Sequence, residues 1–320
     1  MNIKVSVCIP VYGVEKYIEK CARSLFEQTM QDGIEFIFVN DCTKDRSIEI
    51  LEQVLAEYPH RKEQTRIIHH EKNRGLVAAR NTGLAYASGE YIIHCDSDDW
   101  VELDMYEKMY LAAKENDADM VYCDYIEELS NGNSEIYSGG ISQIAENLIC
   151  EFLERKTNWY LHNKMYRKEI ARKNYSESCP DHISYMEDGL RNCAMLRHCN
   201  KLYHLPEALY HYNKQNPSSM VNSFSFESRK MIFEAVTILS DVFQEQKYQK
   251  ALYFRQRQAS WEAITTNHLT PQEWHSLWKK AKTGMWKDKH FSFKRKCIFY
   301  LACINYRLAS HIYRKMKGIS

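Results

Sequence analysis

The sequence predicts an α/β fold, in which a mostly parallel, Rossmann-like sheet carries helices on both faces and a helical region follows it. Over residues 1–125, short apolar runs alternate with stretches whose apolar residues recur every three or four positions. That alternation is typical of βαβ units, whose parallel strands are buried on both faces. From about residue 226 the helical period continues without strands, which predicts a separate C-terminal helical region.

Each element of the alternating part has its own signal. Strands are expected where β-branched and aromatic runs are bounded by turn residues, and helices where the apolar residues follow the helical period. Ser88-Gly89 ends one such helix. The predicted strands are 5–10, 34–40, 66–70, 91–95 and 120–123, and the predicted helices between them are 17–28, 45–58, 76–87 and 104–116.

The rhythm of the sequence changes twice, and these changes predict its domains. Residues 126–222 mix short strands, turns and helices, whereas residues 223–320 are helical. We therefore expect one domain over 1–222, made of the halves 1–125 and 126–222, and a helical region over 223–320.

Composition narrows the class of protein. The 320 residues are 44% hydrophobic and 27% charged, which excludes a disordered chain. No apolar run reaches the ~18 residues of a membrane span, and the first residues read as a strand rather than as a signal peptide. The 11 cysteines are odd in number and lack a Cys-x-x-Cys pair, so we expect a reducing, cytoplasmic compartment and no zinc site.

Ligands of open parallel sheets bind outside the carboxyl ends of the strands. Here those ends carry Pro10-Val11-Tyr12, Asn40-Asp41-Cys42 and Asp96-Ser97-Asp98-Asp99. No Gly-x-Gly-x-x-Gly follows the first strand, and no P-loop motif occurs in the sequence. A dinucleotide fold and a P-loop are therefore disfavoured, and a phosphate at this acidic edge would need a metal ion.

Asp96-Ser97-Asp98 closes the fourth predicted strand. Because alternate residues of a strand point to the same side, Asp96 and Asp98 can converge on one cation. Carboxylate oxygens suit Mg²⁺ or Mn²⁺, which keep positions open for a diphosphate. The alternative is that one of these acids only caps the helix that follows.

Three further residues suit a nucleotide. Asp41 can accept a hydrogen bond from the imide N–H of a base, and Tyr12, at the neighbouring strand end, can stack on the same base. Arg80 lies on the helix before the acidic strand end and can neutralise phosphate. The alternatives are a turn carboxylate for Asp41 and a solvated helix face for Arg80.

These motifs follow one another in a set order. They are Pro10-Val11-Tyr12, Ser24-Leu25…Gln28-Thr29, residues 34–41, Asn73-x-Gly75, Ala79-Arg80-Asn81-x-Gly83, Gly89-Glu90-Tyr91-Ile92 and Asp96-Ser97-Asp98-Asp99. The ordered set resembles family 2 of the inverting glycosyltransferases, which have a GT-A fold and serve in bacterial surface polysaccharide assembly. The resemblance covers about residues 4–125 closely. It continues more loosely through Asn163-Lys164-Met165-Tyr166-Arg167, Glu187-Asp188 and Tyr210-His211-Tyr212.

The resemblance implies a role for each matching position. Residues 1–125 would be the half that binds the nucleotide sugar, and residues 126–222 the half that binds the acceptor and holds the base. The donor would be bound by Pro10, Tyr12, Asp41, Arg80, Asp96 and Ser97. Mn²⁺ or Mg²⁺ would be ligated by Asp98 and Asp96, with His211 as a third ligand. The sequence departs from the family pattern at Gly13, where many relatives have Asn, and at Asn40-Asp41-Cys42-Thr43, which replaces Asp-Asp-Gly-Ser. UDP is the expected donor nucleotide, and GDP stays open.

Inverting transfer also needs a carboxylate that takes the proton of the incoming hydroxyl. A carboxylate on a metal is a poor base, because the cation lowers its pKa. A second acidic pair is therefore expected, and Glu187-Asp188 follows the apolar segment 183–186 directly before a predicted helix. The resemblance assigns the base to Asp188, with Glu187 beside it. The alternative is that both acids stabilise the helix N-terminus. Trp159, Tyr160 and His162 could line an acceptor site or simply pack.

The C-terminal segment is strongly basic. From Lys279 to the end there are 12 Lys and Arg and one acid, Asp288. Residues 291–317 are predicted to form one amphipathic helix with the apolar stripe Cys297, Leu301, Ile304, Leu308 and Ile312. An apolar stripe with basic flanks fits an interfacial helix on anionic lipid. The alternative is a helix docked on the protein through that stripe; no nucleic-acid partner is expected, because no binding module is present.

The sequence therefore predicts a cytoplasmic, metal-dependent inverting glycosyltransferase, peripheral on the inner face of the cell membrane. It would move a hexose-type sugar from a nucleoside diphosphate to a saccharide hydroxyl, on a lipid-linked acceptor. One alternative is a nucleotidyltransferase on a similar sheet, although Val11-Tyr12-Gly13-Val14-Glu15 lacks the Gly-rich, basic loop of that class. The other is an inactive saccharide- or membrane-binding module.

Overall fold

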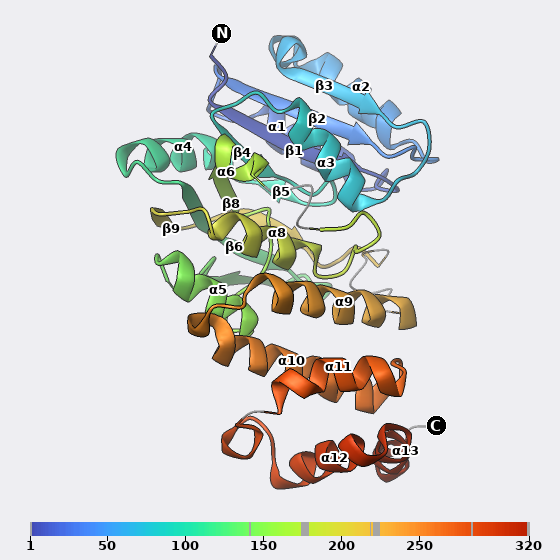
Figure 1. Ribbon diagram of the computed structural model, residues 1–320. Helices are drawn as coiled ribbons and strands as arrows, with labels where there is room; N and C mark the ends of the chain where they lie inside the picture. Colours follow the sequence, from blue (N-terminus) through green and yellow to red (C-terminus); the bar gives the residue numbers. More distant parts are fainter. Residues whose placement is uncertain are drawn as a thin grey trace. The chain divides into compact units, whose positions relative to one another are not determined.

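The computed structural model describes residues 2–140, 142–173, 179–217, 219, 225–282 and 284–318. The chain divides into two compact units (Figure 1). The first comprises Met1–Ile149 with Thr157–Ser223, and the second comprises Cys150–Lys156 with Phe224–Ser320.

The first unit is built on a nine-stranded sheet of order β3-β2-β1-β4-β8-β6-β9-β5, with β7 paired to β6. β1, β2, β3 and β4 are mutually parallel, and β6 is parallel to β9. β8 is antiparallel to both β4 and β6. The mostly parallel sheet predicted from the sequence is thus confirmed. The strands are β1 (Val5–Val11), β2 (Ile34–Asn40), β3 (Thr65–His69), β4 (Tyr91–His94), β5 (Trp100–Val101), β6 (Met120–Glu128), β7 (Ser134–Tyr137), β8 (Lys164–Arg167) and β9 (Leu202–Asn213).

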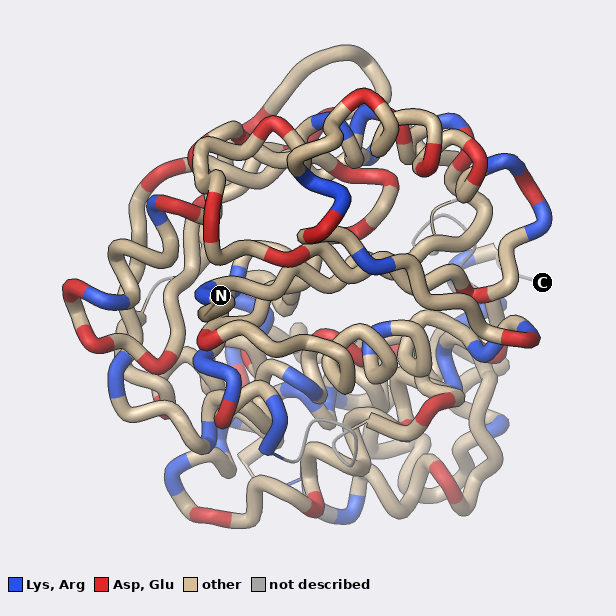
Figure 2. Tube along the Cα trace, turned by 90° about the horizontal axis from the view of Figure 1, so that it is seen from above, with Lys and Arg blue, Asp and Glu red and all other residues tan. Residues whose placement is uncertain are grey.

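Helices connect the strands, and their bounds lie close to the predicted ones. They are α1 (Ile18–Phe26), α2 (Ser47–Glu57), the 3-10 helix η1 (Pro59–Gln64), α3 (Leu76–Tyr86), α4 (Met105–Glu115), α5 (Ala145–Leu153), α6 (Lys168–Arg172) and α8 (Glu187–Leu196). β6 runs five residues beyond the predicted strand, because its second half alternates buried and half-buried residues instead of continuing as an apolar run. Acidic and basic residues are interspersed along the trace (Figure 2).

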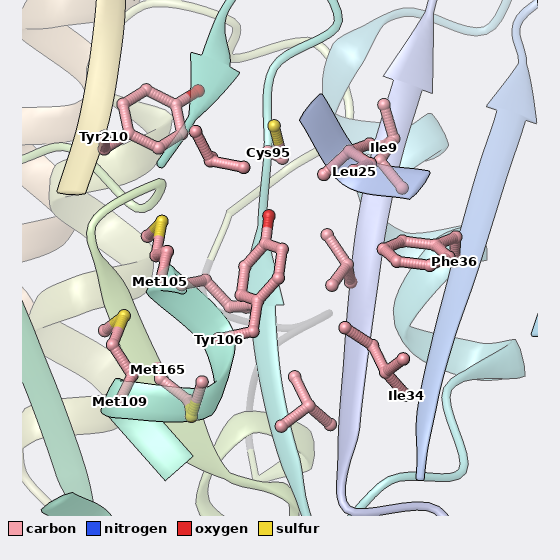
Figure 3. Close-up of a cluster of buried hydrophobic side chains, with 14 of the residues drawn as sticks. Ile9, Leu25, Ile34, Phe36, Cys95, Met105, Tyr106, Met109, Met165 and Tyr210 are labelled. Atoms are coloured by element: carbon pink, nitrogen blue, oxygen red, sulfur yellow. The ribbon is translucent and has the colours of Figure 1, made fainter. Parts of the chain in front are cut away.

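The core of this unit joins side chains from distant parts of the sequence (Figure 3). Strands of the sheet contribute β-branched and aromatic residues, and α1 and α4 cover them with Leu and Met side chains. Residues at this contact include Ile9, Leu25, Ile34, Phe36, Cys95, Met105, Tyr106, Met109, Met165 and Tyr210. Because a close-packed core transmits strain, it fixes the strand ends relative to one another.

The second unit is helical. Its elements are α9 (Phe226–Val242), α10 (Gln246–Thr266), α11 (Pro271–Ala281), the 3-10 helix η3 (Met285–Lys287), α12 (Phe293–Ile304) and α13 (Tyr306–Lys317). Its core includes Trp274, Trp278, Phe299 and Tyr306. Among the described helices, none combines the length and the apolar character needed to cross a membrane.

The prediction of one continuous helix over 291–317 is wrong. α12 ends at Ile304, and Asn305 adopts an extended backbone before α13 begins. The side chain of Asn305 accepts a hydrogen bond from the backbone N–H of Leu308 at 3.0 Å, so Asn305 caps a new helix instead of continuing the old one. The predicted stripe is also not the docking face: Cys297, Ile304 and Leu308 are exposed.

Candidate functional site

Three parallel strands bring the predicted site residues to one edge of the sheet. Val11 of β1 is opposite Asn40 of β2, and Cys8 of β1 is opposite His94 of β4. Because the strands are parallel, Tyr12, Asp41 and the acidic segment 96–99 all follow carboxyl ends at the same edge. Pro10 and Ser97 are buried there, whereas the ring of Tyr12 is 54% exposed and accessible to a ligand.

Asp41 is buried and holds the turn that leads into α3. It accepts hydrogen bonds from His70 Nδ1 at 2.7 Å and from the backbone N–H groups of Arg74 at 2.8 Å and Gly75 at 2.7 Å. Gly75 has φ +88°, a conformation that favours glycine. The carboxylate is thus oriented by its own loop, and a base would meet it in this fixed orientation. Its role in base binding stays a prediction.

Arg80 gathers the acidic residues that the sequence places far apart. Its guanidinium is buried and donates to Asp96 Oδ1 at 2.6 Å and to Asp188 Oδ1, and it also contacts Glu187. The strand-end acid and the predicted base therefore share one arginine, although 92 residues separate them in the chain. Burial alone would raise the pKa of Asp96, but Arg80 and His162 together outweigh that effect and hold the pKa well below its ordinary value.

Glu187 and Asp188 differ in their surroundings. Glu187 is buried and forms a second ion pair, with Arg191 Nε at 2.8 Å from its Oε2. The side chain of Asp188 is 22% exposed, so an acceptor hydroxyl can approach it. Both acids lie in the first turn of α8, as the helix N-terminus alternative requires. Exposure nevertheless favours Asp188 over Glu187 as a proton acceptor.

The backbone around Glu187 and Asp188 is fixed by an unusual conformation before α8 and by close packing within it. Met186, the residue before α8, has φ +66°, which costs strain in a residue other than glycine. Gly189 lies so close to Trp159 that a Cβ atom there would be 2.3 Å from Cε3 of its ring. α8 can pack in this place only because residue 189 has no side chain.

Asp98 and Asp99 are held by β9 and the turn after it. Asp98 accepts from Asn216 Nδ2 at 2.8 Å. Asp99 accepts from the Tyr210 hydroxyl at 2.5 Å and from the backbone N–H of Asn213 at 2.8 Å. Burial, and then the charge of Asp96, raises the pKa of Asp98; burial, and then the charge of Asp98, raises that of Asp99.

His162 lies beside this acidic cluster. Its ring stacks on Tyr210, with centroids 3.9 Å apart, and its Nδ1 lies 3.9 Å from Asp96 Oδ2. Its Nε2 is buried and has no hydrogen-bond partner in the described part of the chain. Ligand atoms of Asp96, Asp99 and His162 lie within 4.8 Å of one another. Because burial lowers the pKa of His162, its ring is neutral at pH 7 and can ligate a metal. These donors fit a divalent cation.

His211, the predicted third ligand, lies between two glutamates. Its Nδ1 is 2.8 Å from Glu128 Oε1 and its Nε2 is 2.9 Å from Glu102 Oε1. Its ring also stacks on Trp100. Both nitrogens therefore have carboxylate partners, and whether one of them reaches a metal stays a prediction. Sequence reasoning placed His162 only among acceptor-site candidates, because no spacing relates it to the acidic strand end.

The comparisons with known proteins agree with this geometry. The family model for glycosyl transferase family 2 matches residues 6–177. A Bacillus subtilis protein described as the uncharacterized glycosyltransferase EpsJ is 34% identical over 226 residues, which are 68% of this chain and 62% of EpsJ. The chain thus spans less than two thirds of that relative.

Two solved structures share the fold. TarS 1–349 from S. aureus has a TM-score of 0.69 at 19% identity, and the match covers 98% of this chain and 92% of TarS 1–349. A second TarS structure contains UDP-GlcNAc. A mannosyltransferase from Pyrobaculum calidifontis, in complex with GDP-Man and Mn²⁺, has a TM-score of 0.53 at 12% identity, and the match covers 98% of this chain and 87% of the mannosyltransferase. The fold is thus GT-A, and the chain belongs to glycosyl transferase family 2.

Proposed function

We propose that the protein is a metal-dependent, inverting glycosyltransferase. It moves a hexose-type sugar from a nucleoside diphosphate to a saccharide hydroxyl in the synthesis of a cell-surface polysaccharide. The observation that carries the proposal is the Arg80 cluster, which joins the strand-end acid Asp96 to the partly exposed acid Asp188. A metal-binding carboxylate and a separate base are the two acidic groups that this reaction needs.

The donor is a nucleoside diphosphate sugar, with UDP as the preferred nucleotide. Tyr12 stacks on the base and Asp41 accepts from it, while Pro10, Ser97 and Arg80 line the path toward the diphosphate. Support for UDP comes from the TarS complex with UDP-GlcNAc. The mannosyltransferase complex with GDP-Man keeps GDP as the alternative donor nucleotide.

Mn²⁺ or Mg²⁺ is the proposed cofactor. Asp96, Asp99 and His162 would supply ligand atoms. Asp98, the ligand expected from the sequence, precedes Asp99 in the chain and accepts a hydrogen bond from Asn216. His211 stays a candidate ligand from the sequence. A bound cation would act as a Lewis acid and neutralise the charge of the departing diphosphate.

The protein residues then divide the transfer between them. In an in-line displacement, the acceptor oxygen forms a bond to the anomeric carbon while the bond from that carbon to the phosphate oxygen breaks. Asp188 takes the proton of the acceptor hydroxyl, and Glu187 stays paired with Arg191. Arg80 fixes Asp188 relative to Asp96 and can turn a donor hydrogen toward phosphate.

The acceptor and the location of the enzyme belong to the same proposal. We place the enzyme in the cytoplasm, peripheral on the inner face of the membrane, with a lipid-linked saccharide as acceptor. The support is the basic C-terminal segment, which has 12 Lys and Arg and one acid from Lys279 to the end, and no nucleic acid is involved.

The test is release of free UDP from UDP-sugars with Mn²⁺ and a saccharide acceptor. Asp188→Asn should keep the affinity for UDP and lower transfer by about 10²–10⁴, because an amide cannot take the proton. Asp32→Asn, an exposed carboxylate in a turn, is the matched control and should transfer like wild type. Transfer by Asp188→Asn within a few fold of wild type would place the base elsewhere.

A further inference from the structure

The last two helices carry apolar side chains that the core of the second unit does not use. α12 docks through a buried face formed by Ile298, Phe299 and Ala302. On its opposite face, Phe293, Cys297, Tyr300 and Ile304 follow one another at intervals of four, three and four residues. Phe293 is 74% exposed and Ile304 is 84% exposed. α12 is therefore apolar on two opposite sides. The second side is only partly covered, because Tyr300 packs against the core of the second unit while Phe293, Cys297 and Ile304 are exposed.

The exposed side extends beyond α12. Leu308, in the first turn of α13, is 46% exposed. Trp286, half exposed, stacks on Tyr300 with ring centroids 5.0 Å apart and lies 6.0 Å from the ring of Phe293. We call Phe293, Cys297, Tyr300, Ile304 and Leu308 the C-terminal stripe. Exposed apolar side chains gathered in this way, with polar residues around them, are typical of an interaction site.

The surroundings of the C-terminal stripe are basic. Lys294 follows Phe293 and Lys296 precedes Cys297, so the two lysines flank the stripe on opposite sides. The one acid after Lys279, Asp288, is buried and paired with Arg257 at 2.6 Å. In the described residues from 284 to 318, no acidic side chain is therefore exposed to offset the positive charge. Because acidic and basic residues are interspersed elsewhere on the trace (Figure 2), the excess of positive charge is local to this segment.

We propose that the C-terminal stripe docks on the surface of an anionic lipid bilayer. Phe293, Ile304 and Leu308 would enter the interface, Trp286 and Tyr300 would lie at the headgroup level, and the lysines would face the acidic headgroups. A second copy of the chain fits worse, because two basic surfaces would meet. Nucleic acid would leave the aliphatic part of the stripe without a partner. Lipid satisfies both the apolar and the charged part of the surface.

Flotation with vesicles of phosphatidylcholine alone, or of phosphatidylcholine with phosphatidylglycerol, tests the proposal at low salt. The wild-type chain should float with the anionic vesicles and far less with the neutral ones. Phe293→Ser/Ile304→Ser should lower vesicle binding about tenfold or more, because it removes buried apolar area at the interface. Lys294→Gln/Lys315→Gln removes the lysine beside Phe293 and an exposed lysine in the last turn of α13, and it should lower vesicle binding about fivefold for each lysine removed. All four side chains are exposed, so circular dichroism should show an unchanged fold.

Matched controls come from the first unit. Ile136→Ser removes an aliphatic side chain that is 72% exposed, and Lys62→Gln/Lys72→Gln removes two exposed lysines; all should float like wild type. The proposal is overturned if the wild type ignores anionic vesicles, or if the stripe variants float as well as it does. It is also overturned if light scattering shows a dimer that Phe293→Ser/Ile304→Ser converts to monomer, or if duplex DNA displaces the protein from vesicles. Because the readout is lipid binding, failure of the proposed transfer reaction would leave this test intact.

Discussion

Arg80 links the two carboxylates that the proposed reaction needs on different sides of the sugar. Its contacts to Asp96 and Asp188 are direct, and both carboxylates are only partly covered by protein. At the scale of single residues, the site is therefore a small set of acids kept close together by one buried arginine. Without that cation, the acids would repel one another at short range in a medium that screens poorly.

The histidine of the cation site can be identified by two matched variants. His162→Phe keeps a ring that can stack on Tyr210 but removes the ligand nitrogen, and His211→Phe does the same at the ring on Trp100. We expect His162→Phe to weaken Mn²⁺-dependent UDP binding about tenfold or more, since even outer partners of a metal site cost 10–100-fold. Binding of UDP in EDTA should not change.

Calorimetric titration of UDP with and without Mn²⁺ measures both variants. His211→Phe should titrate like wild type, because Glu102 and Glu128 occupy its nitrogens. The reverse pattern, a lost Mn²⁺ effect in His211→Phe alone, would show that the assignment from the sequence is right and that His162 only packs.

Lys164 should make stability depend on pH. It is buried, with Nζ donating to the Tyr160 carbonyl at 2.7 Å and to Asn163 Oδ1 at 2.9 Å, and burial lowers its pKa to about 7. Between this value and the unfolded pKa of about 10.4, the unfolded chain binds more protons than the native one. The free energy of unfolding should therefore rise with pH in that window, by up to about 1.4 kcal/mol per unit.

Urea unfolding between pH 7 and 9.5 checks this sign. Lys164→Met should remove the rise, so the difference from wild type should change with pH, whereas Lys62→Met, at an exposed lysine, should leave the slope unchanged. If the free energies of unfolding of wild type and Lys164→Met run parallel with pH, the pKa of Lys164 is not lowered in the native protein.

At the scale of elements, α8 is the part that carries the proposed base. It begins after a strained Met186, and its first turn lies against Trp159 at Gly189. A helix that follows a strained residue and packs this closely against an aromatic ring has little freedom to shift. That rigidity keeps the Asp188 carboxylate in reach of Arg80.

Gly189→Ala should therefore move α8. The added Cβ would meet the Trp159 ring at 2.3 Å, so the helix or the ring must shift. We expect a loss of about 1–3 kcal/mol in stability and a fall in transfer of tenfold or more, because small misplacements at a reacting centre are costly. UDP affinity should persist, since Tyr12 and Asp41 lie on other elements.

A double variant separates this steric cause from others. Trp159→Leu frees space beside residue 189, so Gly189→Ala/Trp159→Leu should recover part of the transfer that Gly189→Ala loses, beyond what additivity allows. Additive losses in initial-rate assays would contradict the steric explanation.

At the scale of the whole molecule, the two units carry different proposed sites. The Arg80 cluster and the strand-end acids all belong to the first unit, and the C-terminal stripe belongs to the second. The buried residues of α12 and α13 complete the core of the second unit, and other residues of the same two helices stay exposed.

Removal of residues 291–320 should consequently unfold the second unit. It deletes Phe299 and Tyr306 from the core. It also removes the hydrogen bonds that the hydroxyls of Tyr306 and Ser310 donate to the carbonyls of Ala263 at 2.8 Å and Ile264 at 2.7 Å, respectively. Each buried aromatic is worth about 3–5 kcal/mol. Four of the six tryptophans lie at residues 261–286, so their near-ultraviolet circular dichroism reports the loss.

Phe293→Ser/Ile304→Ser is the control, since it changes only the exposed face and should keep the native signal. A truncated chain with an unchanged spectrum would show that α12 and α13 are dispensable for the core. In that case truncation itself would become a valid test of lipid binding.

The sequence by itself determined the alternating strands and helices, the acidic strand end at Asp96–Asp99 and the family. Those features are local: hydrophobic period, turn residues and short motifs act over a few residues, and their order along the chain is enough to identify them. The choice of Glu187-Asp188 as a second acidic pair also came from the sequence, through the chemistry that inversion requires.

Only the tertiary structure decided which side chains meet. Arg80 and Asp188 are 108 residues apart, and His162 is 66 residues from Asp96, so no spacing rule could join them. The same holds for the tail, where the sequence shows an apolar stripe but not which face the core covers. The core contains Phe299 and Ala302, whereas Ile304 is exposed. The shape of the neighbouring helices, as well as hydrophobicity, determines which face of a helix is buried.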